Sequence, residues 1–506
     1  MTKNANFFLS LQQGIQSSLS KPCIDGPDFP VLSYSELADL TAQAANLLKS
    51  LGVKAGARVL VQTQKTPLGI AFYLACLRSG AIYVPLNIAY TADELDYFIE
   101  DTEPNLFVCD STKRKTLEDL FSKHNIPTIL EINSSGQGSL LDQLNAFPKQ
   151  HEIVHVDADD IAVILYTSGT TGKPKGAMLS HDNLNSNAQS LYKIWDWQKD
   201  DVLIHALPIF HIHGLFVALH LSLLGGTSML FLSRFDAGQI TQLLPQASVL
   251  MGVPTFYTRL LQQDSLNSDL CKNMRLFVSG SAPLLEETSN FFAERSGHRI
   301  LERYGMSETG MLMSNPLDGE KIPGTVGFAL PDVSYRVCDD DGNTLSPGSI
   351  GTLHVKGPNI FQGYWRNPEK TKQEFKEGYF ITGDLVNEDS DGRISIVGRN
   401  KDLIISGGYN VYPKEVELVM DEFEAISESA VIGVSHPDFG EAVVAVVVQS
   451  NLDQKLDEQE IINNLKNRLA AYKVPKKIFV KDELPRNTMG KVQKNLLRNE
   501  YDKLFK

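Results

Sequence analysis

The chain has 506 residues, which at about 150 residues per domain predicts roughly three structural units rather than one small module. Hydrophobic residues make up 42% of the sequence and charged residues 21%, a composition typical of a globular protein with extended cores. The 47 basic residues are outnumbered by 61 acidic ones, giving a net charge of −14. This balance argues against a protein that binds nucleic acid or anionic membranes, but it does not exclude a local cationic pocket for a small anion such as ATP.

The cysteines are scattered, without the C-x-x-C spacing of a zinc site or the pattern of a disulfide framework. The N-terminus lacks a basic segment followed by a sustained apolar one, and no stretch reaches the ~18 apolar residues of a membrane span. We therefore expect a protein of the reducing cytoplasm with no membrane insertion. Its core or surface thiols are Cys23, Cys76, Cys109, Cys271 and Cys338.

The first third of the chain alternates between helix and strand patterns. Apolar residues between positions 35 and 49 recur at helical spacing, and after a break the apolar run 59–61 predicts a buried strand. The same alternation then predicts helices at 70–77 and from residue 92, and strands at 81–84 and 106–109. Because helices and strands alternate, the strands should form a mostly parallel sheet.

Later segments extend this α/β pattern and then leave it. Further strands are expected at 161–165, 228–232, 249–252 and 276–279. Residues 331–397 contain short apolar runs broken by Asp-Gly and Pro-Gly turn signals, which favours a small β-rich lobe. Beyond residue 399 we expect strands at 430–434, 443–448 and 478–480 and a helix near 458–471.

These patterns predict an α/β protein of two domains. The large N-terminal domain, residues 1–399, should contain two parallel-sheet lobes and the small β-rich lobe. A small α+β domain, residues 400–506, should follow it, with a size in the usual range for a domain.

The most informative segment runs from Tyr166 to Gly176 and follows the strand expected at 161–165. Its small residues can present backbone N–H groups and hydroxyls to a phosphate, and its lysines add positive charge. It is not a Walker A loop, because Pro174 would disturb the helix that must follow such a loop. The alternative interpretation is a flexible Gly/Thr surface turn.

This segment resembles the phosphate-binding signature of the adenylate-forming superfamily, which includes acyl-CoA synthetases, adenylation domains and luciferases. Tyr304-Gly-Met-Ser-Glu308 is similar to the YGxTE motif of that superfamily, with Ser307 in place of the usual threonine. The resemblance implies that Tyr304 stacks near adenine, that Ser307 meets the α-phosphate and that Glu308 helps to hold Mg²⁺. It also implies that ATP is bound by Thr167, Ser168, Gly169, Thr170, Thr171 and Lys175.

Further motifs follow in the order found in that superfamily. Ser279–Pro283 resembles the turn that lines adenine, which assigns Ser281, Ala282 and Pro283 to the nucleotide site. Thr382-Gly-Asp384 resembles the motif whose aspartate accepts hydrogen bonds from both ribose hydroxyls, a task that suits the two oxygens of a carboxylate. The resemblance also implies that Arg399 reaches the ribose or the phosphates.

The same resemblance implies that the first domain binds ATP and the acid and that the C-terminal domain is mobile. It also assigns three features to the C-terminal domain. Lys401 would be the pivot of an interdomain hinge, and Gly407, Gly408 and Tyr409 would form the tunnel for the pantetheine arm of coenzyme A. Lys491, in a PxTxxGK-like motif, would contact the acid and the α-phosphate during adenylation. A mobile ammonium at that point would stabilise the transition state electrostatically, because two anions approach each other there.

His205, His211 and His213 include a His-x-His pair, which can supply two zinc ligands. A zinc site needs three or four ligands, and no third one stands at a convincing spacing. We therefore interpret this stretch as non-metal. It resembles the superfamily's substrate-gate motif, in which His211 would line the acid pocket.

Two arginines point to the kind of acid. Arg259 and Arg303 stand where pockets of the superfamily are usually apolar or small, and a long-chain or aryl acid would leave a buried guanidinium there without a partner. A second carboxylate on the substrate would pair with it, since the planar fork of arginine binds carboxylates bidentately. The alternative is that both arginines are surface or structural ion-pair residues.

The whole chain resembles the malonyl-CoA synthetases. That resemblance implies the ATP-dependent ligation of malonate to coenzyme A, with Mg²⁺, through malonyl-AMP. The alternatives are a ligase for methylmalonate or another acid, an adenylation module that loads a carrier-protein thiol, and a nucleotide-binding regulatory protein without catalysis. The sequence does not predict whether the protein is a monomer or a dimer.

Overall fold

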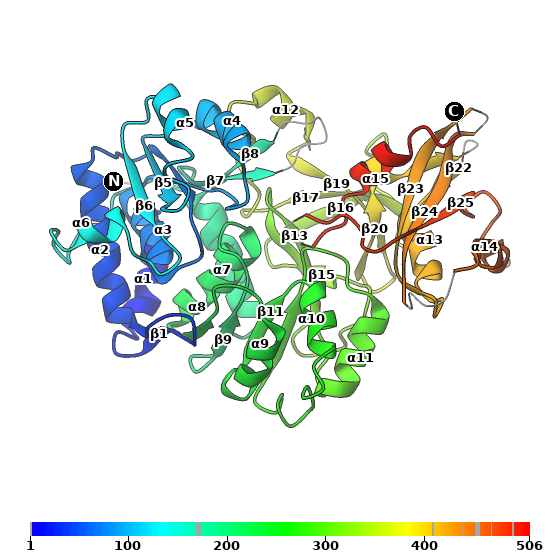
Figure 1. The fold of residues 1–506 in the computed structure, drawn as a ribbon, viewed down its shortest axis with the longest axis horizontal. Coiled ribbons are helices and arrows are strands. Elements are labelled where there is room, and N and C mark those ends of the chain that lie inside the picture. The colour runs from blue at the N-terminus through cyan, green and yellow to red at the C-terminus, as the bar shows by residue number, and fades with distance from the viewer. Residues whose placement is uncertain are drawn as a thin grey trace. The chain divides into compact units, whose positions relative to one another are not determined.

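The computed structural model describes residues 3–167, 174–406, 409–437, 439–450, 456–466, 468–487 and 490–505. The chain divides into two compact units (Figure 1). The first unit comprises Met1–Pro323, Gly327–Ser334 and Lys356–Phe380. The second unit comprises Gly324–Val326, Tyr335–Val355 and Ile381–Lys506.

One sheet of the first unit has six strands in the order β6-β5-β3-β4-β7-β8. All neighbours are parallel except the antiparallel pair β7 and β8. The strands are β3 (Arg58–Gln62), β4 (Ile82–Pro85), β5 (Leu106–Asp110), β6 (Ile129–Ile132), β7 (Ile161–Thr167) and β8 (Lys175–Ser180). The helices of this part are α1 (Phe8–Gln16), α2 (Tyr34–Ser50), α3 (Pro67–Ser79), α4 (Ala92–Thr102), α5 (Glu118–Lys123) and α6 (Ser139–Leu144).

Local sequence signals start and stop the helices of this sheet. Helix α2 begins with a capping box, in which Ser33 and Glu36 satisfy each other's backbone N–H groups. Helix α3 is capped by the Thr66 side chain and ends at Gly80, whose φ of 67° is left-handed and suits glycine. Because α3 packs against α1, α2 and β4, nearly all its residues are buried.

The other sheet of the first unit has nine strands in the order β15-β14-β13-β12-β11-β9-β10-β1-β2. The six strands from β13 to β1 in that order are parallel, and the ends of the sheet are antiparallel. They are β1 (Pro22–Asp25), β2 (Leu32–Ser33), β9 (Val202–His205), β10 (Ser228–Phe231), β11 (Val249–Gly252), β12 (Leu276–Ser279), β13 (Leu301–Met306), β14 (Gly310–Ser314) and β15 (Phe328–Ala329).

The helices that accompany this sheet include one π-helix, η1 (His213–Ala218). The others are α7 (His181–Ile194), α8 (Leu219–Gly225), α9 (Ala237–Leu243), the 3₁₀-helix η2 (Leu244–Gln246), α10 (Pro254–Leu261) and α11 (Glu286–Ser296). The first unit also contains α12 (Pro368–Gln373) and β18 (Phe375–Lys376).

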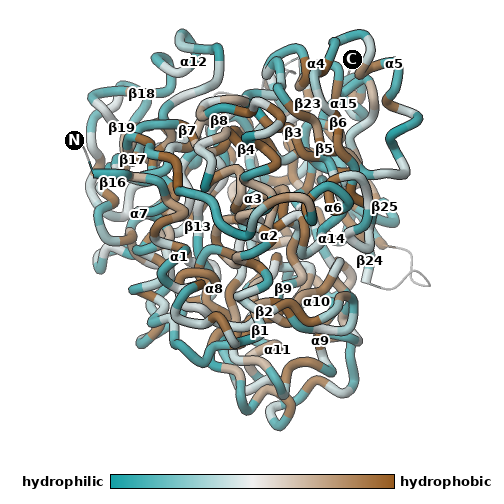
Figure 2. Tube along the Cα trace, turned by 90° about the vertical axis from the view of Figure 1, so that its left-hand side faces the viewer, coloured by the Kyte–Doolittle hydropathy of each residue, from teal (hydrophilic) through white to brown (hydrophobic). Residues whose placement is uncertain are grey.

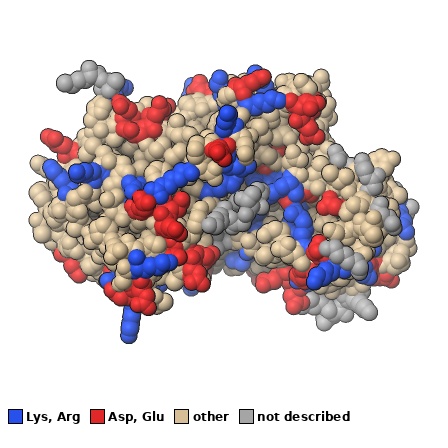
Figure 3. Space-filling model, turned by 90° about the horizontal axis from the view of Figure 1, so that it is seen from above, with Lys and Arg blue, Asp and Glu red and all other residues tan. Residues whose placement is uncertain are grey.

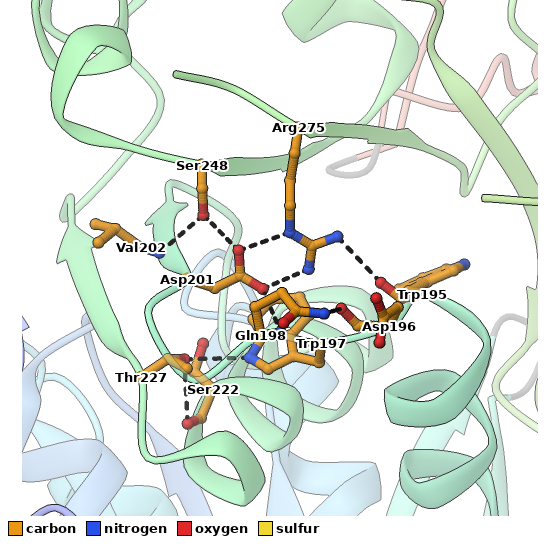
Figure 4. Close-up of polar contacts among 10 residues, drawn as sticks. All are labelled: Trp195, Asp196, Trp197, Gln198, Asp201, Val202, Ser222, Thr227, Ser248 and Arg275. Atoms are coloured by element: carbon orange, nitrogen blue, oxygen red, sulfur yellow. Dashed lines mark hydrogen bonds and ion pairs between the residues drawn. The ribbon is translucent and has the colours of Figure 1, made fainter. Parts of the chain in front are cut away.

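A buried polar network joins the loops at one end of this sheet (Figure 4). The Asp201 carboxylate accepts hydrogen bonds from Arg275 Nε at 2.7 Å and from Ser248 Oγ at 2.6 Å. It also accepts from the backbone N–H of Gln198 at 2.8 Å, and its side chain is only 2% exposed. Each oxygen therefore has partners that compensate for its removal from water.

Replacing Asp201 by asparagine should destabilise the protein by about 2–4 kcal/mol, because the largely buried Arg275 would lose its counter-ion. The midpoint of thermal unfolding should fall by several degrees. Asp196→Asn is the matched control, since that exposed residue lies in the same loop at a φ of 43°, which asparagine tolerates. Equal midpoints for the two variants would show that the network adds no stability.

The second unit contains two sheets. One has the neighbours β16-β17-β19, with β20 paired to β19, and the other has the order β22-β21-β24-β23, with β25 paired to β24. The strands are β16 (Ser334–Cys338), β17 (Ile350–Lys356), β19 (Tyr379–Glu388), β20 (Ile394–Arg399), β21 (Ile404–Ser406), β22 (Tyr409–Val411), β23 (Ile426–His436), β24 (Gly440–Gln449) and β25 (Lys477–Lys481). The helices are η3 (Asn400–Asp402), α13 (Pro413–Met420), α14 (Glu458–Lys466) and α15 (Lys494–Tyr501).

Strand β24 is apolar on both faces because each face covers a different core. Val443, Ala445 and Val447 face a core that includes α13 and α14, whereas Val444 and Val446 face a core that includes α15. A strand buried on both sides should read as a continuous apolar run, and residues 442–448 do so. Figure 2 shows hydrophobic segments alternating with hydrophilic turns along the described parts of the chain.

The predicted α/β fold is confirmed, and most predicted elements lie within a few residues of those observed. The 331–397 segment is rich in strands, as predicted, and also contains the short helix α12. The helix expected near 458–471 ends earlier, at Lys466. The domain boundary after residue 399 remains a prediction, because it concerns which residues move together.

All five cysteines are buried free thiols. Among the described helices, none combines the length and the apolar character that a bilayer crossing requires. On the face presented in Figure 3, basic side chains are interspersed with acidic ones. The excess of negative charge therefore does not form one continuous patch there.

Candidate active site

Glu308 is the centre of a buried polar cluster in the first unit. It lies in the turn between β13 and β14 and is 6% exposed. Its Oε1 accepts a hydrogen bond from Thr167 Oγ1, at the end of β7, at 3.3 Å and lies 3.2 Å from the Tyr364 hydroxyl. The structure therefore brings together two predicted site residues that are far apart in the sequence.

The cluster extends through Tyr364 to Glu374. The Tyr364 hydroxyl lies 2.6 Å from Glu374 Oε2, and Lys175 Nζ lies 3.3 Å from Glu374 Oε1. Burial alone would raise the pKa of Glu374, but the hydrogen bond from Tyr364 and the charges of Lys370 and Lys175 lower it, so this carboxylate is ionised. The sequence analysis missed Tyr364 and Glu374, because no local motif marks them.

Tyr364→Phe should lower kcat/KM for the expected substrate ATP by about 5- to 30-fold, because the hydroxyl that lies between the carboxylates of Glu308 and Glu374 is lost. Pyrophosphate release at varied ATP concentration measures this. Tyr335→Phe is the control, since it removes a similar bond to Glu388, 3.0 Å long, in the second unit. Equal losses in the two variants would refute a specific role of Tyr364.

The segment predicted to bind phosphate is described only at its two ends. Ser168, Gly169, Thr170 and Thr171 lie outside the described residues. Thr167 and Lys175 are cross-strand partners in the β7–β8 pair. The chain continues from Pro174 into a strand rather than a helix, as expected for a segment that is not a Walker A loop.

Arg303 is the most unusual charged residue of the first unit. It lies on β13, is 3% exposed, and its Nε and Nη2 atoms have no hydrogen-bond partner among the described residues. Burial lowers the pKa of its guanidinium to about 9, which leaves it charged at neutral pH. A buried cation without a partner is unfavourable, so this guanidinium is chemically suited to pair with an anion.

The surroundings of Arg303 are tightly packed at Gly280 and supply hydrogen-bonding groups nearby. A Cβ atom at Gly280 would lie 2.4 Å from the guanidinium carbon, so any larger residue there would displace the guanidinium. Ser281, in a left-handed conformation with φ 74°, places Oγ 3.4 Å from Nδ1 of the buried His213. Burial and the charge of Arg303 hold the pKa of His213 well below its usual value, which keeps this ring neutral.

The other predicted pocket residues differ in their surroundings. His211 is half-buried beside Phe210, and burial lowers its pKa to about 4. Arg259, on helix α10, is exposed, and its guanidinium lies 5.8 Å from the centre of the Phe235 ring. Tyr304, Ser307 and Ala282 are half-buried and Pro283 is exposed.

The second unit holds a charged cluster around Asp384. Asp384 and Arg399 are cross-strand partners on β19 and β20, and Arg399 Nε lies 2.8 Å from Asp384 Oδ1. The hydroxyl of Thr382 accepts a hydrogen bond from the backbone N–H of Asp384 and donates one to the carbonyl oxygen of Leu353. The Thr-Gly-Asp motif is thus fixed by its own threonine.

Lys401 and Lys491 belong to the same electrostatic cluster. Displacement of water by the surrounding protein, together with the charge of Arg399, lowers the pKa of both ammonium groups, and that of Lys491 to about 8. Lys491 nevertheless keeps an exposed side chain. Tyr409 is exposed and stacks on Tyr472 at 4.8 Å, and Gly407 and Gly408 lie outside the described residues.

Comparison with known proteins identifies the family. Residues 13–365 match the model of the AMP-binding enzyme, and residues 415–491 match the AMP-binding enzyme C-terminal domain. The chain belongs to the AMP-binding enzyme family. Within the regions matched by the family models lie Thr167, Glu308 and Arg303 of the first unit and Lys491 of the second.

Several AMP-binding enzymes resemble the chain over most of its length. The crystal structure of ATP-bound MatB from Rhodopseudomonas palustris is 50% identical, covers 100% of both chains and superposes with a TM-score of 0.97. A malonate–CoA ligase of Arabidopsis thaliana is 33% identical over 91% of this chain and 80% of its own length. A feruloyl-CoA synthase of an Amycolatopsis species is 32% identical over 93% and 94%. These last two relatives are about equally similar to the chain in sequence, although their names refer to very different acids. Overall identity therefore does not indicate the acid, and the residues of the acid pocket must be compared instead.

Proposed function

We propose that the chain is an AMP-forming acid:CoA ligase that joins malonate to coenzyme A at the expense of ATP. A carboxylate oxygen of malonate attacks the α-phosphorus of ATP, forming malonyl-AMP and releasing pyrophosphate. The thiolate of coenzyme A then attacks the acyl carbon, a C–S bond forms, the C–O bond of the mixed anhydride breaks, and AMP leaves. No covalent bond to the protein is required.

The observation that carries the malonate assignment is the buried guanidinium of Arg303. One carboxylate of malonate must be left to react, and the other needs a cation. Arg303 provides it, because its Nε and Nη2 have no partner among the described residues and can form a bidentate pair. Neutral His213 and the Ser281 hydroxyl offer hydrogen bonds beside it without competing for the positive site. A feruloyl side chain would leave Arg303 uncompensated.

Glu308 is proposed to hold Mg²⁺ together with the phosphates of ATP. Magnesium prefers hard oxygen ligands and is usually bound through one or two carboxylates and substrate phosphates, a need that the buried Glu308 carboxylate fits. The described residues contain no group of three or more His, Cys, Asp or Glu side chains that could hold a metal alone. The ion would neutralise charge that develops on the phosphates.

The remaining assignments extend the resemblance residue by residue. Asp384 would accept hydrogen bonds from the two ribose hydroxyls, and Tyr304 would stack on adenine. Lys491 would stabilise the transition state of adenylation. Residues 400–506 are proposed to move about Lys401 between the two half-reactions. Gly407, Gly408 and Tyr409 would then guide pantetheine.

A pyrophosphate-release panel tests the proposed function. Purified protein is supplied with ATP, Mg²⁺ and, in turn, acetate, propionate, malonate, methylmalonate and succinate. Malonate should give the highest kcat/KM. The kcat/KM for methylmalonate should be about 10- to 200-fold lower, since one methyl group in a pocket is worth ~1–3 kcal/mol. A preference for monoacids would refute the malonate assignment but not the ligase.

A second assay separates free coenzyme A from a protein-bound thiol. Thioester formation is followed with coenzyme A and, separately, with a carrier protein that bears a pantetheine arm. We expect the thioester with coenzyme A. Transfer to the carrier alone would show an adenylation module instead.

A further inference from the structure

Lys65 is a buried lysine that the proposed reaction does not use. It lies just after β3 and is 7% exposed. Its ammonium donates to the His205 carbonyl oxygen at 2.7 Å and lies 2.9 Å from Nδ1 of the same residue. The ammonium also lies 4.1 Å from the centre of the Phe231 ring, a favourable cation–π distance. Because removing a lysine ammonium from water is energetically unfavourable, its burial here indicates a specific role.

The contacts on the two sides of the His205 ring fix the position of its proton. Nε2 of His205 lies 2.9 Å from the carbonyl oxygen of Gly214. A carbonyl oxygen only accepts, so Nε2 must carry the hydrogen, and Nδ1 must then be the acceptor for Lys65. Burial and the nearby Lys65 hold the pKa of His205 well below its usual value, so the ring does not carry two protons.

Gly214 links this ring to the acid pocket. It directly follows His213 in the first turn of η1, and a Cβ atom there would lie 2.1 Å from the Pro208 carbonyl oxygen. Residues 206–213 therefore form a tightly packed loop that starts at His205 and carries His211 and His213. The His205–Gly214 hydrogen bond ties the end of this loop back to its beginning.

We propose that Lys65 is a positioning residue of the acid pocket. By donating to Nδ1 it selects the His205 tautomer that can donate to Gly214, and so holds His213 beside Ser281 and Arg303. Without Lys65 the ring can carry its hydrogen on Nδ1, and two acceptors would then face each other at Gly214. The pocket should loosen, and the acid should bind less well.

The tautomer itself can be measured in the unmodified protein. ¹⁵N-labelled histidine gives different nitrogen shifts for protonated and bare ring nitrogens, and the His205 signals are assigned as those lost in His205→Gln. We expect Nε2 protonated and Nδ1 bare in the wild type. A proton on Nδ1 would overturn the proposal, even if every Lys65 variant failed to fold.

Kinetics of Lys65→Met test the consequence for the pocket. We expect the KM for malonate to rise about 10-fold, as for the loss of one well-placed hydrogen bond, while kcat and the KM for ATP change less than about twofold. The His205 spectrum should show the Nδ1-protonated tautomer in addition to the Nε2-protonated one. Phe231→Leu is the matched control, because it disturbs the packing around the same ammonium but leaves the donor in place. It should lower the melting temperature without changing the tautomer.

A second substitution distinguishes positioning from general loosening. In His205→Gln the amide nitrogen can replace Nε2 and donate to Gly214 without any choice of tautomer. Lys65→Met/His205→Gln should therefore have a malonate KM closer to the wild type than Lys65→Met alone. A double variant as impaired as Lys65→Met, or an equal change in the KM for ATP, would overturn the proposal. It rests on the proposed function for the identity of the acid, but the tautomer measurement does not, so the two can fail separately.

Discussion

Replacing Arg303 by methionine should lower kcat/KM for malonate by about 10²- to 10³-fold. Methionine keeps apolar volume but removes the guanidinium, so the distal carboxylate would enter the pocket without a counter-ion, which costs about 3–4 kcal/mol. The same change should raise activity with propionate or butyrate, whose apolar ends no longer meet a buried charge. Pyrophosphate release with each acid measures both effects.

Two other arginines calibrate this result. Arg299→Met removes an exposed guanidinium close to the start of β13 and should leave kcat/KM within about twofold. Arg259→Met removes the other predicted acid-binding arginine, and because Arg259 is exposed its contribution should be screened by water and remain below about threefold. If Arg259→Met lowered kcat/KM for malonate more than Arg303→Met does, Arg259 and not Arg303 would have to be assigned to the distal carboxylate.

Replacing Lys491 by alanine should slow adenylation by about 10²- to 10³-fold and leave the second half-reaction largely intact. The ammonium is needed where two anions approach each other, and this need ends once malonyl-AMP exists. Adenylation is measured by pyrophosphate release, and thioester formation is measured with supplied malonyl-AMP and coenzyme A. Equal loss in both half-reactions would contradict the role.

The lowered pKa of Lys491 adds a pH test of the same residue. Its ammonium has a pKa of about 8, below the usual lysine value, so the charged form is present below pH 8 and is lost above it. Adenylation should therefore fall as the pH rises through about 8. In Lys491→Arg the guanidinium stays charged, so the alkaline decrease should disappear even if the overall rate is lower. An unchanged decrease in that variant would assign it to another group.

Much of the fold could be predicted because local patterns and tertiary packing agree. The amphipathic stretch predicted at 35–49 became α2, which has a capping box at its start, and the run 59–61 became the centre of β3. The resemblance assigned Thr167 and Glu308 to the binding of ATP and its Mg²⁺, and in the structure their side chains are hydrogen-bonded. Lengths were less predictable, since α14 ends five residues before its pattern does.

The sequence could not distinguish Arg303 from Arg259 by residue type alone. A signal was present, because Phe256, Tyr257 and Leu260 form the buried face of α10 and leave Arg259 on the exposed one. Nothing comparable marked Tyr364 or Lys65. Their partners are contributed by other segments of the chain, and such pairings become visible only when the sheets are assembled.

If the dicarboxylate binds at Arg303 as proposed, the lifetime of the protein would depend on its substrate. The folded state bears an electrostatic penalty that the unfolded chain, in water, does not, and a dicarboxylate bound there would remove it. Ligand at 100 times its dissociation constant adds ~2.7 kcal/mol to the stability of the folded form. A cell rich in the acid would thus unfold and degrade fewer copies of the protein, so the amount of enzyme would follow the supply of its substrate without any change in gene expression.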